Sequence, residues 1–160
     1  MNQQLIECVP NFSEGRDLGI IKQITNEIES VEGVKLLDVD PGAATNRTVV
    51  TFVGTPQAVV DAAFKAIVKA GELIDMSKHS GEHARMGATD VCPFIPVANI
   101  TMEETAKWAT TLAQKVGEST TIPVYLYGES QPNKNRNVLS IIRAGEYEGF
   151  FEKIKKPAFK

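Results

Sequence analysis

The chain has 160 residues, of which 42% are hydrophobic, so it is long enough to bury the core of one domain of ordinary size. A formal net charge of −3 gives no general basic character, which makes nucleic acid a poor partner. The amino terminus lacks a basic flank before an apolar run, and no apolar run is long enough for a membrane span. We therefore expect a cytoplasmic protein, with Cys8 and Cys92 reduced and packed in strands.

The first third of the chain alternates short apolar runs with helical periodicity. Residues 5–9 predict a strand. Apolar residues then recur at three- and four-residue spacing over 18–31, and Gly33 follows as a stop, which predicts an amphipathic helix. The β-branched runs 34–39 and 48–53 predict an antiparallel pair of strands joined by a polar loop.

The next segments continue this alternation. A helix is predicted over 56–73, with Thr55 as its N-cap and a proline at its first position. A strand is predicted over 91–97, where two prolines indicate an edge, a bulge or an early end. Thr101 begins a third helix, with a glutamate three residues later to complete a capping box. Residues 124–127 predict a last strand.

A polar loop over 128–137 and a helical tail complete the chain. The order β-α-β-β-α-β, followed by α-β and the tail, predicts an α+β sandwich of the ferredoxin-like split βαβ kind, with a mixed or antiparallel sheet and helices on one face. Apolar residues at 37 and 39, and at 49 and 50, predict that the other face is apolar too. That face must then pack against another sheet, domain or subunit, so we expect a dimer at least.

Both histidines of the chain lie in one loop. His79 and His83 flank Gly81, and the stretch continues through Arg85 to Gly87. Histidine is the only side chain whose ordinary pKa lies near neutral pH, so this loop holds the chain's natural proton carriers. The glycines allow conformations, positive φ included, that gather polar groups around a ligand. The pattern predicts an active-site loop.

Other interpretations of the two histidines were weighed. Their spacing would suit a metal site on a helix, but Gly81 disfavours a regular helix, and Glu82 precedes the second histidine where a zincin has its glutamate directly after the first. No metal is therefore predicted. His79 is equally well explained as an exposed loop residue, and His83 could form a structural ion-pair cluster with Glu82 and Arg85.

Several separated blocks of the sequence carry a family resemblance. They lie, in chain order, at residues 7–15, 36–40, 45–49, 51–54, the histidine loop, 123–129 and 143–148. These blocks resemble the amino-terminal subdomain of the glutamate formimidoyltransferase family, the transferase part of formiminotransferase-cyclodeaminase. The resemblance implies transfer of a formimidoyl group between N5 of tetrahydrofolate and the amino group of L-glutamate, in histidine degradation. Tetrahydrofolate is then a co-substrate, and no metal is expected.

The same resemblance implies which residues carry the reaction. The family's catalytic histidine falls on His83, and its carboxylate at the end of a strand falls on Asp40. An amine attacks an amidine-like carbon, so one proton must leave the incoming nitrogen and another must reach N5. We expect His83 to take and return that proton, and Asp40 to orient the imidazole or to stabilise the cationic intermediate.

The substrates are rich in carboxylates, so the site needs cations and hydrogen-bond donors. Arg47 and Arg85 suit a carboxylate because a guanidinium binds it bidentately, although pairing of Arg47 with a local acid of the fold, such as Asp38, would explain that arginine nearly as well. Asn11 and Asn46 are candidate donors to a ligand, with turn formation as the equal alternative. The expected substrate-binding residues are Arg85, Arg47, Asn11, Asn46, Glu82 and His79.

The resemblance also bears on domain organisation. The family's transferase unit has two similar subdomains with the folate between them, and residues 1–160 correspond to the first as a single domain. The chain is then half of an enzyme, completed by a missing segment, a separate chain or self-association. The alternative is a non-catalytic folate-binding or regulatory module that keeps the fold. The presence of His83 and Asp40 favours the enzyme, because a binding module needs no base.

Overall fold

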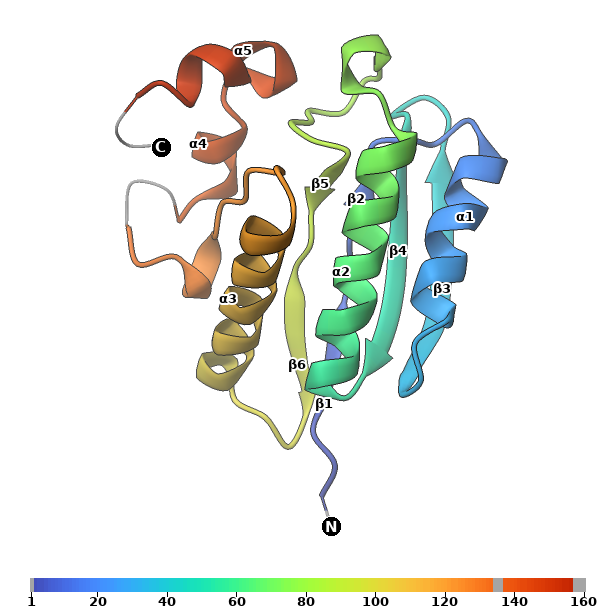
Figure 1. Ribbon diagram of the computed structural model, residues 1–160, viewed down its shortest axis with the longest axis vertical. Coiled ribbons are helices and arrows are strands. Elements are labelled where there is room, and N and C mark those ends of the chain that lie inside the picture. The colour runs from blue at the N-terminus through green and yellow to red at the C-terminus, as the bar shows by residue number, and fades with distance from the viewer. Residues whose placement is uncertain (1, 134–136, 157–160) are drawn as a thin grey trace.

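An antiparallel sheet forms the centre of the computed structural model, which describes residues 2–133 and 137–156 (Figure 1). Its strands are β1 (Leu5–Cys8), β2 (Asn11–Phe12), β3 (Val34–Gly42), β4 (Arg47–Gly54), β5 (Thr89–Val91) and β6 (Phe94–Ala98). β3 pairs with one edge of β4, while β1 and β2 lie end to end along the other. β6 pairs with β1, β5 pairs with β2, and every pairing is antiparallel. The predicted α+β class is confirmed.

The predicted pair of strands is the longest ladder of the sheet. In β4 the side chains of Thr48, Val50 and Phe52 are buried on one face, as the alternation of a half-buried strand requires. β3 carries a register shift around Leu37 and continues to Gly42, past its predicted end at residue 39. The Asp-Pro-Gly sequence predicted a turn there, but β3 is an edge strand, where a proline without an N–H is tolerated in the ladder.

Three long helices cover one face of this sheet. They are α1 (Leu18–Glu29), α2 (Pro56–Leu73) and α3 (Met102–Ser119), each within a few residues of its prediction. The Thr101 hydroxyl accepts a hydrogen bond from Glu104 N at 3.1 Å, which confirms the predicted cap. Thr55 stands at the N-cap of α2 without a side-chain bond to the helix.

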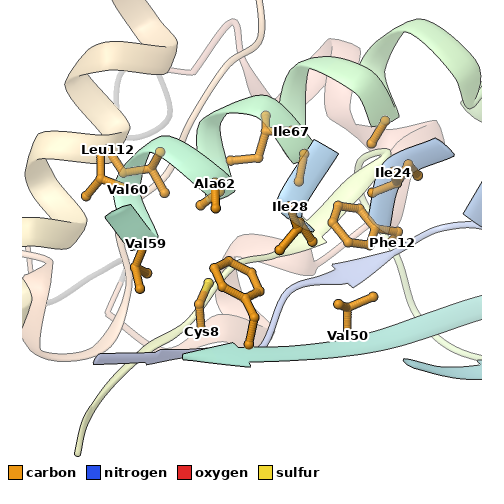
Figure 2. Close-up of a cluster of buried hydrophobic side chains, with 14 of the residues drawn as sticks. Cys8, Phe12, Ile24, Ile28, Val50, Val59, Val60, Ala62, Ile67 and Leu112 are labelled. Atoms are coloured by element: carbon orange, nitrogen blue, oxygen red, sulfur yellow. The ribbon is translucent and has the colours of Figure 1, made fainter. Parts of the chain in front are cut away.

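The hydrophobic core lies between these helices and the sheet. Figure 2 shows Cys8, Phe12 and Val50 projecting from the strands toward Ile24 and Ile28 of α1 and toward the apolar face of α2. These side chains are almost completely buried, and each one of such size stabilises the fold by roughly 1.5–3 kcal/mol. The core therefore fixes α1, α2 and the central strands as one unit.

The opposite face of the sheet is open in this structure. Leu37 and Val97 are 51% and 53% exposed, and Ile95 is also exposed. Glu7 pairs in register with both Val53 and Ile95, so a charged side chain lies among these apolar ones. The predicted second apolar face is thus present in a mixed form, and two of the residues that predicted it, Val39 and Val50, pack on the core side of the sheet instead.

The last part of the chain that the structure describes is helical, as predicted. Short turns η1 (Met76–Lys78) and η2 (Gly128–Ser130) precede α4 (Leu139–Arg143) and α5 (Glu146–Lys153). The strand predicted over 124–127 is wrong: the carbonyls of Leu126 and Tyr127 accept hydrogen bonds from the nearby Gln131 and Ser130 side chains, in place of a ladder. The polar loop predicted over 128–137 includes residues 134–136, which lie outside the described part.

The predicted strand over 91–97 is present as two pieces. β5 and β6 are separated by Cys92 and Pro93, and the register of β6 against β1 shifts beside Pro96, which bears out the bulge that the prolines indicated. Cys8 lies buried in β1, but Cys92 lies in this break, where the proline interrupts the ladder, so its predicted place in a strand is wrong. Both thiols are free, with their Sγ atoms 3.5 Å apart, and burial raises the pKa of the Cys8 thiol.

Among the helices of the described residues, none has the length and apolar character needed to cross a membrane.

Candidate active site

The histidine loop, residues 79–88, lies directly against the turn that joins β3 to β4. Glu82 N donates to Ala44 O at 3.2 Å. A Cβ on Gly81 would lie 2.3 Å from Thr45 O, so only glycine allows this approach of the two backbones. Positive φ, which we expected of the loop glycines, is found at neither Gly81 nor Gly87. Glycine is therefore required at position 81 because there is no space for a Cβ, and not because of its backbone conformation.

Asn46 joins the turn to the loop. Its backbone has φ +49°, a left-handed conformation that asparagine tolerates better than most residues. The side-chain Oδ1 accepts from Gly15 N at 2.9 Å, and Nδ2 donates to Ser80 O at 3.0 Å. With both ends of the amide bonded to the protein, the structure supports the turn-forming alternative for Asn46 over a donor to ligand.

His79 supports the loop from within. Its Nε2 lies 2.9 Å from Asn46 O and therefore carries the proton, while Nδ1 accepts from Arg85 Nε at 3.0 Å. Both ring nitrogens are thus used, and the imidazole is half-buried. His79 is neither a free surface group nor available as a ligand-binding base in this arrangement.

Arg85 is 7% exposed and is paired within the chain. Its Nη1 and Nη2 donate to the two carboxylate oxygens of Glu148 at 2.9 and 2.7 Å, and Nη1 also reaches Glu146 Oε1 at 3.3 Å. The Arg85 guanidinium lowers the pKa of Glu148 to about 2. The bidentate carboxylate that we expected Arg85 to bind is therefore supplied by α5. Glu82, in contrast, is exposed, with only its backbone engaged.

The candidate site itself is a cavity of about 220 Å³ at the end of the open sheet face. Asp40 of β3 and Asn11 of β2 both pair with Val49 of β4, so their side chains reach the same face of the sheet, one on each side of Val49. The lining residues come from β2, the β3–β4 hairpin and the histidine loop: Asn11, Asp40, Gly42, Thr45, Arg47, Val49 and His83. The structure thus brings together both predicted catalytic residues.

Arg47 is the central side chain of this cavity. Its Nε donates to Asn11 Oδ1 at 2.8 Å, and its Nη1 donates to Asp90 Oδ2 at 2.7 Å. Pairing of Arg47 with an acid of the fold, the alternative given above, is thus found, but the partner is Asp90 and not Asp38. Asp38 lies opposite Thr51 in the ladder, four residues along β4 from the arginine. Asn11 holds Arg47 through Oδ1, and its Nδ2 donates to Val9 O at 3.0 Å.

His83 is exposed and borders the cavity. Its Nδ1 lies 2.7 Å from Ala84 O, a contact that needs the proton on Nδ1, and 3.2 Å from Arg47 Nη1, a contact that needs the lone pair there. The shorter contact, with the carbonyl, favours the tautomer with the proton on Nδ1. Nε2 then keeps its lone pair, as a base requires. No hydrogen bond joins His83 to Asp40 within the described residues, and the two share the cavity without contact.

Three groups of functional interest were missed by the sequence reasoning. Asp90 pairs with both Arg47 and Arg143, and Glu146 and Glu148 pair with Arg85. Asp90 lies in β5, two residues after the histidine loop, and this nearness is the signal that could have singled it out. We refer to the following side chains as the polar network: Asn46, Arg47, His79, Arg85, Asp90, Arg143, Glu146 and Glu148.

A larger cavity, of about 660 Å³, lies between α3, β5–β6 and the segment 121–130. Its walls are mainly apolar, from residues such as Leu112, Ile122 and Phe150, and neither histidine lines it. Size alone does not make it the catalytic site, because both histidines lie elsewhere. Within residues 2–133 and 137–156, no cluster of three or more His, Cys, Asp or Glu side chains could hold a metal ion.

The fold and the cavity define an α+β domain that presents a histidine, a carboxylate and an arginine on the open face of an antiparallel sheet. Residues 5–160 match the family model of the formiminotransferase domain, N-terminal subdomain, and the chain belongs to that family.

Longer relatives share this sequence. The chain is 55% identical over 154 residues to formimidoyltransferase-cyclodeaminase of Gallus gallus, covering 96% of this chain and 28% of the relative. It is 47% identical over 158 residues to glutamate formimidoyltransferase of Thermoplasma acidophilum, and the match covers 98% of this chain and 52% of that relative. It is 42% identical over 151 residues to glutamate formimidoyltransferase of Streptococcus pyogenes serotype M1, and the match covers 94% of this chain and 50% of that relative. The chain thus spans about half or less of the length of these relatives.

Proposed function

We propose that this chain supplies the N-terminal half of a glutamate formimidoyltransferase site. The reaction is transfer of a formimidoyl group between 5-formimidoyltetrahydrofolate and L-glutamate, with His83 as the proton carrier. The single observation that carries the proposal is that His83 and Asp40, 43 residues apart in sequence, line one cavity together with Arg47. The names of the relatives, two of them glutamate formimidoyltransferases, agree with it.

The proton steps follow from the tautomer of His83. Nε2 holds the lone pair and takes a proton from the nitrogen of glutamate once this nitrogen has bonded to the formimidoyl carbon. The imidazolium then returns the proton to N5 of the folate as the carbon–N5 bond breaks. Asp40, which lines the same cavity, stabilises the cationic intermediate through its negative charge. Since it does not bond to the ring, we assign it this electrostatic role over orientation of the imidazole.

Arg47 has one nitrogen to offer a substrate carboxylate. Its Nε and Nη1 are occupied by Asn11 and Asp90, and Nη2 makes no hydrogen bond to the described residues. A carboxylate of glutamate or of the folate tail bound there would enter between Asp40 and His83. Arg85, by contrast, is occupied by Glu148 and acts in the support of the loop.

The cavity is smaller than the 300–1,000 Å³ common for sites of drug-sized ligands, and it opens on the uncovered sheet face. We infer that a second subdomain, on the same polypeptide or on another chain, completes the folate site over this face. The exposed Leu37, Ile95 and Val97 also suit self-association, as a homodimer at least. The cytoplasm is the compartment we propose, since both thiols are free.

We also propose that the domain is ferredoxin-like. β4 separates β1 from β3, and β1 separates β4 from β6, so each helical crossover skips one strand. This arrangement supports a split βαβ unit. Residues 1–160 then form a single domain that corresponds to one subdomain of the transferase.

The test is a transfer assay with 5-formimidoyltetrahydrofolate and L-glutamate, run on the chain alone and with the polypeptide that supplies the rest of the relatives' transferase length. We expect turnover in the mixture, and a loss of about 10²–10⁴-fold in kcat for His83→Gln. Lys78→Gln is the matched control, because Lys78 is an exposed charged residue just before the same loop. Unchanged turnover in His83→Gln would remove the proposed role.

The second candidate function, a folate-binding or regulatory module, makes a different prediction. Equilibrium binding of tetrahydrofolate would persist in His83→Gln, and no mixture would transfer the formimidoyl group. The unpaired Nη2 of Arg47 could serve binding alone, so this outcome is compatible with the geometry.

A further inference from the structure

Asp90 is the most completely buried charged side chain of the polar network, with no side-chain surface exposed to solvent. Oδ2 accepts from Arg47 Nη1 at 2.7 Å and also from Arg143 Nη2, while Oδ1 accepts from Met86 N at 2.6 Å. These donors belong to β4, to α4 and to the histidine loop. One carboxylate therefore joins three parts of the chain that are distant in sequence.

We propose that Asp90 is a positioning residue, which holds the Arg47 guanidinium between Asn11 and His83 and so fixes where the cavity presents its positive charge. The importance of that position rests on the function proposed above. The positioning itself is a property of the folded chain and can be measured without turnover.

The argument begins with the cost of burying Arg47. A guanidinium held away from water needs a counter-charge, because desolvation without one is strongly unfavourable. Asp90 provides that charge through a direct hydrogen bond. Asp40 lines the same cavity, but no hydrogen bond joins it to Arg47 in the described residues. Without Asp90, Arg47 and Arg143 would face each other as like charges, and Arg47 would turn toward the solvent at the mouth of the cavity.

The second contact of Asp90 extends this control to His83. Met86 N lies three residues after His83, and its bond to Oδ1 closes the end of the loop on the same carboxylate that holds Arg47. Arg47 in turn donates to Ala84 O, which accepts the Nδ1 proton of His83. Asp90 thus acts on both walls of the cavity, the arginine and the imidazole, from behind.

Arginine side-chain NMR tests the proposal in this chain as it stands. We expect the Nε–H of Arg47, which donates to Asn11, to exchange with water much more slowly than in free arginine, with the signal assigned through Arg47→Lys. In Asp90→Asn we expect that exchange to become at least about ten-fold faster. Asp38→Asn is the matched control, since it removes a β3 carboxylate that lies opposite Thr51, away from Arg47, and should leave the Arg47 signal unchanged.

Two results of this measurement would overturn the proposal. One is fast exchange of Arg47 Nε–H already in the unaltered chain, a result that decides the question even if Asp90→Asn does not fold. The other is a folded Asp90→Asn variant, shown by its circular dichroism, in which Arg47 stays protected.

Steady-state kinetics on the mixture described under the proposed function tests whether Asp90 acts through Arg47. Asp90→Asn should lower kcat/KM about 100-fold through misplacement of Arg47. When Arg47 is already lysine, Asp90→Asn should lower kcat/KM little further. If Asp90→Asn instead damaged the structure independently, the losses of the two single variants would add in the double variant. Additive losses contradict action through Arg47. If no variant or mixture turns over, the proposed function fails, and the NMR experiment still decides the role of Asp90.

Discussion

The hydrophobic core beneath the helices and the polar network around the histidine loop are held together in different ways. In the core, side chains such as Phe52 and Ile28 are stabilised by burial, which is non-directional and roughly proportional to area. In the polar network each group has specific partners, as when Arg85 bonds both oxygens of Glu148. The core can absorb small changes of shape, whereas the network loses a defined contact with each substitution.

This difference separates global stability from local order. The core joins β1, β4, α1 and α2, so damage there should unfold the domain. The polar network attaches the histidine loop and α5 to that unit, and its loss should release these segments first. Four predictions test this separation.

The largest effect should come from the core. Phe52→Ala removes a fully buried ring beneath α2 and should lower the free energy of unfolding by about 3–5 kcal/mol, measured by urea denaturation. Leu37→Ala on the open face should change it by no more than about 0.5 kcal/mol. Equal losses at the two positions would show that the open face is covered in solution.

The contact between the histidine loop and the β3–β4 turn should be the next most sensitive to substitution. Gly81→Ala forces a Cβ against Thr45 O and should cost about 1–3 kcal/mol, with NMR shift changes that reach His83. Gly87→Ala is the matched control. Its Cβ would meet only Thr89 O at 3.5 Å, an ordinary contact, and its φ is not positive, so we expect no loss of stability. A tolerated Gly81→Ala would mean that the two backbones are further apart.

Arg85→Met should act on attachment more than on global stability. The variant removes the partner of Glu148 and Glu146, and these exposed carboxylates can hydrate once released. Backbone amide hydrogen exchange in α5 should then increase, while exchange in α2 stays as it was. A parallel increase in both helices would show that the network and the core unfold together.

The smallest effect should be a pH dependence of the docking of α5 through the Arg85–Glu148 ion pair. The pKa of Glu148 is lowered from its ordinary value near 4.5 to about 2 by Arg85, so the ion pair stabilises docking of α5 fully above pH 4.5. This contribution should decline as the pH falls below 4.5 and should be lost near pH 2. Exchange of the α5 amides between pH 7 and 2 measures it, and Arg85→Met should lack this component.

The sequence predicted the core region well because its signals are local. Periodicity over 18–31 and 56–73, and the β-branched runs around Val50, follow from burial of one face. The miss at 124–127 arose because an apolar run predicts burial without saying whether a ladder partner is present. The two-residue β2 was too short to leave a pattern.

The candidate site was only partly predictable. Placement of His83, Asp40 and Arg47 at one cavity agrees with the resemblance, but the partners of the arginines could not be read locally. Asp90 lies 43 residues from Arg47, and Glu148 lies 63 residues from Arg85. Many carboxylates are equally plausible partners at such separations, so Asp38 was weighed for its nearness in the chain.

Asn46 sets a condition on transplanting this loop into another scaffold. Its side chain must accept from Gly15 N and donate to Ser80 O while its own backbone adopts a left-handed conformation. Aspartate could not donate, glycine could do neither, and glutamine would be too long for the span. A designer who grafts the histidine loop elsewhere would have to carry this asparagine and its turn along with it.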